Sequence, residues 1–347
     1  MNRLITSYCY ELKKLLIYRK GWLFLLGILV LQAVTAIVAK PSQYDAFDRK
    51  LYASYTETYS GVCSTETENA ILAEKQAADT VMNQTDAVQV TDAEEISRQT
   101  EQKMLAAMKS AALAELQNKY SRLASCREMQ PVLTYDLDLT AYLRLFGMNW
   151  ASLLGMLFLI PMLMLGDAEC GMEQILFPTR TGKSTVIRAK LLAAVTVGTG
   201  LTVVCSVMQW VLLRIRWNMG MLNVPVQSIT GFELCGIHGS VRACMILFWI
   251  LRILAAPASA LLLCMLVSVI RKAPASIAVA VILIAVSASA AEKLPSVSPF
   301  FLVSACSGIG AMKLYALPDL VFLIFFLLLK TAIFRYAAEL AAERPHH

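Results

Sequence analysis

Four consecutive residues, Gly182-Lys183-Ser184-Thr185, have the types and order that end a phosphate-binding loop. In such a loop, G-x-x-x-x-G-K-[ST], several backbone N–H groups surround the phosphates before the lysine reaches them. Here Phe177 stands where the first glycine is required, and Pro178 removes one backbone donor. A long apolar run, rather than a short strand pattern, precedes the motif. The sequence therefore favours a basic loop over a nucleotide site within this chain.

Other groups that could do covalent or metal chemistry are sparse. The motifs H-E-x-x-H and G-x-S-x-G are absent from the sequence, and His238 is the only histidine before the C-terminal pair. The nine cysteines include no C-x-x-C pair, so we predict no metal site. Cys63 and Cys126 lie in a polar segment where they could form a disulfide, although the odd total also fits unpaired thiols. An intramembrane enzyme is disfavoured.

The composition is that of a membrane protein. Hydrophobic residues make up 57% of the chain and charged residues only 16%, whereas soluble domains carry about 25% charged residues. The mean hydropathy is +0.59. The net charge of +6 fits basic loops that face the cytoplasm, so the expected partner is the lipid bilayer and not nucleic acid.

Apolar runs must position the polar groups, and they predict an all-α membrane protein with six transmembrane helices. Residues 4–20 alternate an apolar face with basic residues, including Lys14 and Arg19, that favour lipid headgroups. This pattern is typical of an amphipathic elbow helix on the membrane surface. Residues 292–317 are broken by proline and glycine and are expected to be re-entrant or interfacial. The six expected spans are 21–39, 150–165, 190–213, 243–270, 274–291 and 318–334.

Residues 40–148 have a different character from the spans. They contain 16 acidic and 11 basic residues and no apolar run long enough to cross a membrane. Leu105, Met108, Leu116 and Leu123 recur at helical spacing, and a shorter pattern precedes them. We expect a helical hairpin. It is either a spacer or folded cap without a ligand, or a domain that binds a ligand or partner. The predicted domains are thus 1–39 with the elbow helix and first span, 40–148, and a five-span region 149–347.

Lysine and arginine near the span ends set the expected orientation. With six spans and a cytoplasmic N-terminus, thirteen such residues fall inside and five in the short outer loops. Both termini are then cytoplasmic, the protein is a multi-pass protein of the plasma membrane, and residues 40–148 are extracellular. Two polar residues, Gln209 and Arg252, fall within spans. They either snorkel or bond between helices, or they face a polar pathway.

The connection 166–189 is the only predicted cytoplasmic loop large enough to hold a protein partner. Its first part alternates acidic and apolar residues, which predicts a short amphipathic helix that ends at Pro178. Basic residues follow before the next span.

This connection, "DAECGMEQILFPTRTGKSTVIRAKLLAA", resembles the segment between the second and third spans of type-2 ABC transporter (ABC exporter) permeases. The resemblance lies in an acidic residue, a glycine, an apolar pair, a turn, basic residues and the Ala189-Lys190 pair. The outer "NVPVQSITGF", residues 223–232, also resembles a loop of such permeases from Gram-positive bacteria. The six-span layout, the elbow helix and the large first outer domain match that family along the whole chain.

The resemblance implies a permease subunit of an exporter that pairs with a second permease and with an ATP-binding subunit. It implies that the connection 166–189 is the coupling helix, and that ATP and Mg²⁺ bind the partner while this chain binds no cofactor. The expected docking residues are Asp167, Glu169, Gly171, Glu173, Ile175, Leu176, Arg180, Gly182 and Lys183. The alternative is a membrane sensor or assembly protein whose extracellular helical domain binds a ligand or partner.

Overall fold

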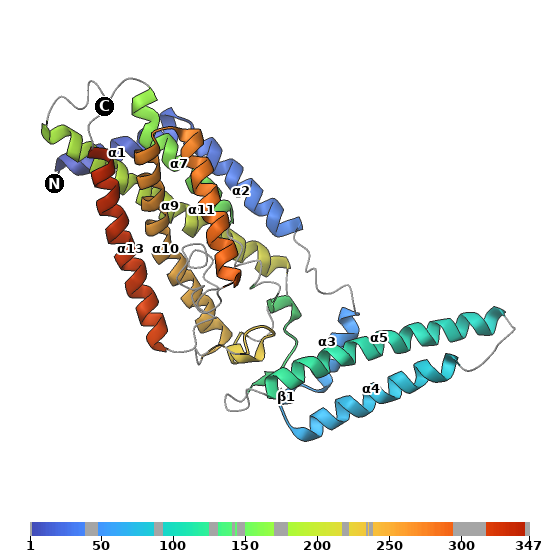
Figure 1. Ribbon diagram of the computed structural model, residues 1–347. Coiled ribbons are helices and arrows are strands. Elements are labelled where there is room, and N and C mark those ends of the chain that lie inside the picture. Colours follow the sequence, from blue (N-terminus) through green and yellow to red (C-terminus); the bar gives the residue numbers. More distant parts are fainter. Residues whose placement is uncertain are drawn as a thin grey trace. The chain divides into compact units, whose positions relative to one another are not determined.

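The computed structural model describes residues 2–38, 48–86, 93–124, 131–140, 143, 150–169, 180–216, 222–233, 235, 239–293 and 317–343. The described chain is mainly helical and divides into two compact units (Figure 1). The membrane unit comprises Met1–Ala39, Leu143–Arg216 and Met245–His347. The hairpin unit comprises Lys40–Tyr142 and Trp217–Cys244.

Long apolar helices form the membrane unit. Five described helices are long and apolar enough to cross a membrane, or six if a bent helix pair near the N-terminus is one span. The chain is therefore a helical, multi-pass membrane protein, as its composition predicts. The helices are α1 (Asn2–Lys13), η1 (Lys14–Tyr18), α2 (Gly21–Val38), α7 (Trp150–Glu169), α9 (Arg180–Arg216), α10 (Val241–Ile270), α11 (Ala273–Lys293) and α13 (Leu317–Glu343).

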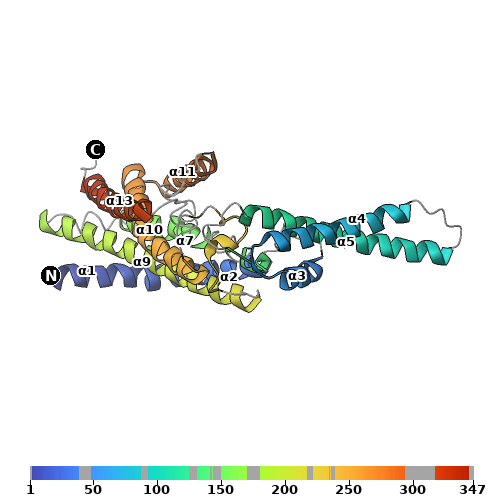
Figure 2. The same cartoon turned by 90° about the horizontal axis from the view of Figure 1, so that it is seen from below.

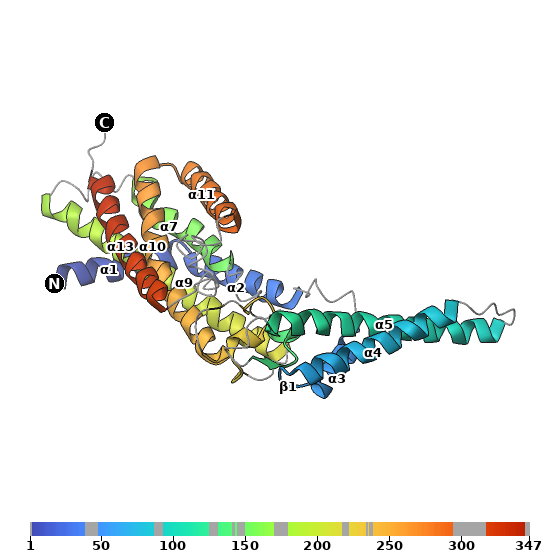
Figure 3. The ribbon, with the colours of Figure 1, turned by 60° about the horizontal axis from the view of Figure 1, so that its bottom comes forward.

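Several helices of this unit pack against α9. This helix packs against α1, α2, α7 and α13, while α7 also contacts α2 and α11 (Figure 3). Small residues bring the helices close, since a Cβ added to Gly198 would lie 3.0 Å from the Cβ of Ala260. Apolar side chains of α7, α9 and α10 fill the core between them, including Leu159, Cys205 and Cys264.

The bend between η1 and α2 depends on two residues. The two apolar helical segments, Leu4–Tyr18 and Gly21–Thr35, meet at 68°. Lys20 adopts a left-handed backbone conformation with φ of 55°. A Cβ at Gly21 would lie only 2.6 Å from the carbonyl oxygen of Leu15, so only glycine fits there. The residues predicted to form an elbow are thus helical and bent from the helix that follows.

The hairpin unit is built around two long helices. Helices α4 (Thr65–Asp86) and α5 (Ala93–Ala124) lie side by side along their lengths (Figure 2). Helix α3 (Arg49–Thr58) packs on α5, and the side chain of Asp48 caps its first turn by accepting from Lys50 N at 2.7 Å. Strands β1 (Gly61–Val62) and β2 (Val132–Leu133) pair antiparallel, which the sequence did not predict.

The core of the hairpin unit lies near one end of α5. Leu116 and Leu123 are fully buried there, with Ile71 of α4 and Tyr52 of α3. Leu105, which the periodic pattern predicted to be buried, is 56% exposed. Among the described elements, α5 packs mainly on α4 beyond the part covered by α3 and β2, and two helices alone cannot bury a whole stripe.

This difference makes a matched pair of substitutions informative. We expect Leu116→Asp to destabilise the hairpin unit by several kcal/mol, because it places an unpaired charge in the core. Leu105→Asp puts the same charge on the same helix in solvent and should leave protease resistance near that of the wild type. Limited proteolysis of the full chain in detergent, followed at cleavage sites in α4 and α5, distinguishes them. Equal resistance of the two variants would contradict the burial pattern.

Candidate functional site

The residues predicted to dock a partner belong to the end of α7, to the start of α9 and to the sequence between these two helices. Helix α7 continues through Asp167 to Glu169, and α9 already begins at Arg180, so helix occupies both ends of the predicted loop. Gly182 and Lys183 lie in the first turns of α9. The remaining predicted docking residues lie outside the described residues, and their role stays a prediction: Gly171, Glu173, Ile175 and Leu176.

Asp167 is the centre of a buried charge cluster at this place. Its side chain is fully buried. Lys14 forms an ion pair with Oδ1, Lys190 Nζ lies 2.9 Å from Oδ2, and Arg19 Nη2 lies 3.8 Å from Oδ1. Lys190 also donates a hydrogen bond to the carbonyl oxygen of Met164 at 3.1 Å. A single carboxylate thus joins the end of α7 to the start of α9 and to the N-terminal helices.

The N-terminal helices contribute more than cations to this cluster. Glu11 on α1 lies 3.2 Å from Lys14 Nζ and is itself buried. Arg19 donates to the carbonyl oxygen of Met162, and its guanidinium occupies the space that a side chain at Gly166 would need. We call Glu11, Lys14, Arg19, Asp167 and Lys190 the Asp167 cluster. It contains three cations and two carboxylates, and such buried charges persist only when paired.

The positions of Lys14 and Arg19 differ from the sequence interpretation. Their side chains are only 10% and 16% exposed, so they point into the protein instead of toward headgroups. Lys13 and Lys20, by contrast, are exposed. The reason is the buried carboxylate of Asp167, which a helical periodicity in residues 4–20 cannot reveal.

The groups brought together at this site are charged side chains. Gly182 to Thr185 form the beginning of a long helix, and the described element before them is helix α7, whereas a phosphate-binding loop follows a strand. Among the described residues, no group of three or more His, Cys, Asp or Glu side chains is arranged to hold a metal ion. The Asp167 cluster is suited to fix helix ends relative to one another.

A second cluster of polar side chains lies within the spans. Arg252 on α10 is fully buried and donates from Nη1 to Ser206 Oγ on α9 at 3.3 Å. Gln209, one turn along α9 from Ser206, is 4% exposed. A snorkelling arginine would expose its guanidinium, so the interior position favours a helix-to-helix role or a polar pathway.

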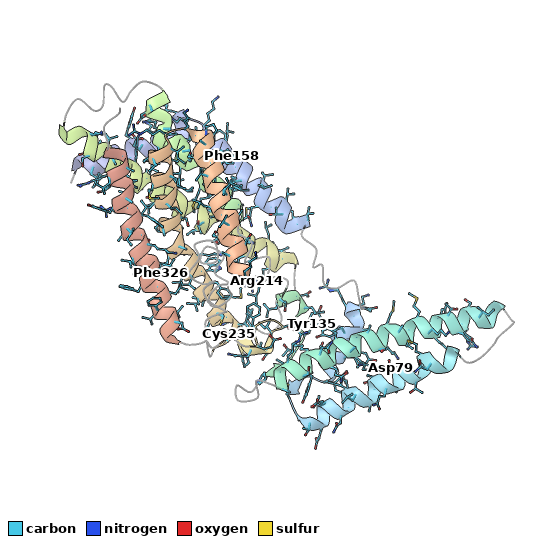
Figure 4. The ribbon with its side chains drawn as sticks, viewed as in Figure 1. Asp79, Tyr135, Phe158, Arg214, Cys235 and Phe326 are labelled. Atoms are coloured by element: carbon cyan, nitrogen blue, oxygen red, sulfur yellow. The ribbon has the colours of Figure 1, made fainter. Side chains whose placement is uncertain are left out.

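Aromatic rings lie on the same two helices. Trp210 of α9 and Trp249 of α10 meet edge to face, with ring centroids 6.4 Å apart. The guanidinium of Arg214, labelled in Figure 4, lies 5.3 Å from the Trp210 ring centroid. Such aromatic and cation–π contacts are favourable where water is scarce.

The hairpin unit has a buried ion pair that sequence reasoning missed. Lys119 Nζ lies 2.6 Å from Asp136 Oδ1, and both side chains are only 2% exposed. Lys119 also donates to the carbonyl oxygen of Thr134 at 2.5 Å. The sequence contains one indication of this ion pair, because Lys119 lies within the apolar stripe of α5, between Leu116 and Tyr120.

This ion pair also holds the loop that follows α9. Thr230 N donates to Asp136 Oδ2 at 2.7 Å, and Val132 N donates to Ser228 Oγ at 2.9 Å. Within the loop, Gln227 Nε2 donates to the carbonyl oxygen of Cys235, which is labelled in Figure 4, at 2.8 Å. Residues 223–232 thereby become part of the hairpin unit.

The predicted disulfide remains a prediction. Cys63 is half-buried against the core of the hairpin unit, and Cys126 lies outside the described residues.

Comparison of the chain with protein-family models, with curated proteins and with solved structures found no match.

Proposed function

We propose that this chain is the permease subunit of an ABC-type exporter in the plasma membrane. A separate ATPase subunit would bind ATP and Mg²⁺, and a second permease subunit would complete the transport pathway. The amphipathic segment that follows α7, residues 170–176, would be the coupling helix that enters a cleft of the ATPase. Movement of the helices would then alternate access to the two sides of the membrane.

The observation that carries this proposal is the Asp167 cluster. A connection that receives force from a partner must be fixed to the spans on both of its sides. Asp167 and Lys190 stand at those two sides and pair with each other at 2.9 Å. Lys14 and Arg19 extend the same attachment to the N-terminal helices. Displacement of the connection would therefore move several helices together.

The proposed orientation has both termini in the cytoplasm and the hairpin unit outside. Within the membrane unit, the start of α1, the ends of α7 and α13, the start of α9 and the α10–α11 turn lie at one end (Figure 1). The turn residues Arg271 and Lys272 are exposed, as are Lys13 and Lys20. Such clustering of basic residues supports a cytoplasmic location for that end. An impermeant thiol reagent that labels a cysteine at Lys183 on intact cells would contradict it.

The decisive measurement is photolabelling of native membranes with a reactive ATP analogue, followed by purification of this chain. We expect the label on a copurifying ATPase and not on this chain. Lys183→Ala should leave that labelling unchanged, since the lysine contacts no nucleotide. Glu169→Lys should reduce copurification of the ATPase at least tenfold, because it reverses a charge beside the docking segment.

The control for this experiment is Glu101→Lys, the same charge reversal at an exposed position of α5. It should leave copurification unchanged. Saturable labelling of this chain, lost in Lys183→Ala, would overturn the proposal. Recovery of a receptor-type or assembly partner without any ATPase would instead favour the sensor or assembly function.

A further inference from the structure

A small cavity lies beside the Asp167 cluster, at the end of the membrane unit where α7, α10 and α13 end and α9 begins. Its volume is about 240 Å³. Both charged residues in its lining, Lys190 and Arg271, are cations, and Ser268 is the third polar residue. The rest of the wall is apolar, including Leu165, Val186 and Ile187. The cavity therefore joins positive charge to an apolar surface.

Ser268 gives this cavity a polar group without an assigned role. The residue is 8% exposed, and its hydroxyl has no hydrogen-bond partner within the described part of the chain. A buried hydroxyl without a partner costs free energy, which a ligand acceptor would recover. The hydroxyl of Ser259, on the same helix, does have a partner, because it donates to the carbonyl oxygen of Ala255 at 3.0 Å.

Arg271 is held at the mouth of the cavity by its backbone. Its N–H donates to the carbonyl oxygen of Val267 at 2.8 Å, and its φ of 55° ends α10 in a left-handed conformation. Its Nε lies 3.4 Å from the carbonyl oxygen of Ser268. The residue is exposed overall.

We propose that this cavity binds the phosphate of an anionic phospholipid, with Arg271, Lys190 and Ser268 around the phosphate. Ligand pockets that enclose a whole small molecule usually measure about 300–1,000 Å³, so this cavity fits a headgroup and not a complete ligand. Two of the helices that line the cavity also carry exposed apolar side chains, Val269 at 62% and Leu340 at 49% exposure. These side chains provide a surface for acyl chains, which a free phosphate would not use.

The proposed lipid site requires no ATPase partner, because a cationic, partly apolar cavity at the end of the membrane unit forms it. Bound lipid would lie next to Lys190, the residue that pairs with Asp167, and would add negative charge to a cluster with an excess of cations. The lipid would thereby stabilise the attachment of α9 to α7.

Native mass spectrometry of the purified full chain, with any copurifying subunit, tests this inference. The probes are short-chain phosphatidylglycerol, phosphatidylcholine with the same chains, and inorganic phosphate. We expect phosphatidylglycerol to bind at least tenfold more tightly than phosphatidylcholine, and inorganic phosphate not to compete at equal concentration. Arg271→Gln should weaken phosphatidylglycerol binding roughly tenfold, the loss expected for one charge-assisted hydrogen bond.

The matched control is Lys272→Gln, which removes the same charge from the next residue but from outside the cavity lining. It should change affinity less than twofold. Ala168→Phe fills the cavity from an exposed position of α7 and should also reduce binding, even if Arg271→Gln disturbs folding. Equal binding of the two lipids, equal losses in the two Gln variants, or full competition by inorganic phosphate would each overturn the lipid assignment.

Discussion

Asp167→Asn is expected to destabilise the membrane unit by about 3–5 kcal/mol, the usual cost of breaking a buried ion pair. The substitution keeps the size of the side chain but removes the charge that neutralises Lys14, Lys190 and Arg19. These three cations would remain largely buried with only the carboxylate of Glu11 among them.

The measurement is the thermal unfolding midpoint of the purified chain in detergent. Glu339→Gln provides the control, since Glu339 pairs with Arg188 and Arg335, whose side chains are 56% and 66% exposed. Exposed pairs contribute about 0–1 kcal/mol, so that control should behave nearly as wild type. Lys190→Met in the Asp167→Asn background should recover part of the loss. Equal midpoints for Asp167→Asn and Glu339→Gln would show that the cluster does not stabilise the fold.

Asp136→Asn is expected to have the largest effect in the hairpin unit. It leaves the buried Lys119 ammonium without its counterion, at a cost of about 3–5 kcal/mol. The amide oxygen of asparagine can still accept from Thr230 N, so the loss should come mainly from the charge. Both α5 and the segment around β2 should loosen, since Lys119 also holds the carbonyl oxygen of Thr134.

Hydrogen exchange of the full chain can locate this effect. Amides of α5 near Lys119 and those of residues 226–230 should exchange faster in Asp136→Asn. Asp138→Asn is the matched control on the same segment, because Asp138 pairs with Arg49, whose side chain is 42% exposed. That control should cost about 1 kcal/mol or less. Unchanged protection in Asp136→Asn would mean that the pair is energetically neutral.

Much of the architecture was predictable because hydropathy is a strong signal. The apolar runs from Ala243 and Pro274 correspond to α10 and α11 within a few residues. The start of α9 at Arg180 was less accessible, since Arg180 to Lys190 are polar enough to suggest a loop yet compatible with helix. Leu105 was predicted to be buried but is exposed. Periodicity identifies the apolar face of a helix, but not how far along that face other elements pack.

The contacts between side chains were harder to predict than the helix or connection to which each residue belongs. Asp167 was placed in the predicted connection and Lys190 at the start of the span that follows, but nothing in the spacing pairs them with each other or with Lys14. Lys14 lies far from them in sequence and only tertiary packing brings the three together. The burial of Arg252 likewise depends on its neighbours on α9, which a hydropathy profile averages away.

Helix α9 has a mechanical consequence that follows from its length. Its 37 residues form one uninterrupted helix without proline, about 55 Å long, against a hydrocarbon core of about 30 Å. Such a rod behaves as a lever. A rotation of about ten degrees around its middle would move its two ends by roughly 5 Å in opposite directions. A displacement of Arg180 at one end of the helix would then produce a displacement of Arg216, at the other end, in the opposite direction.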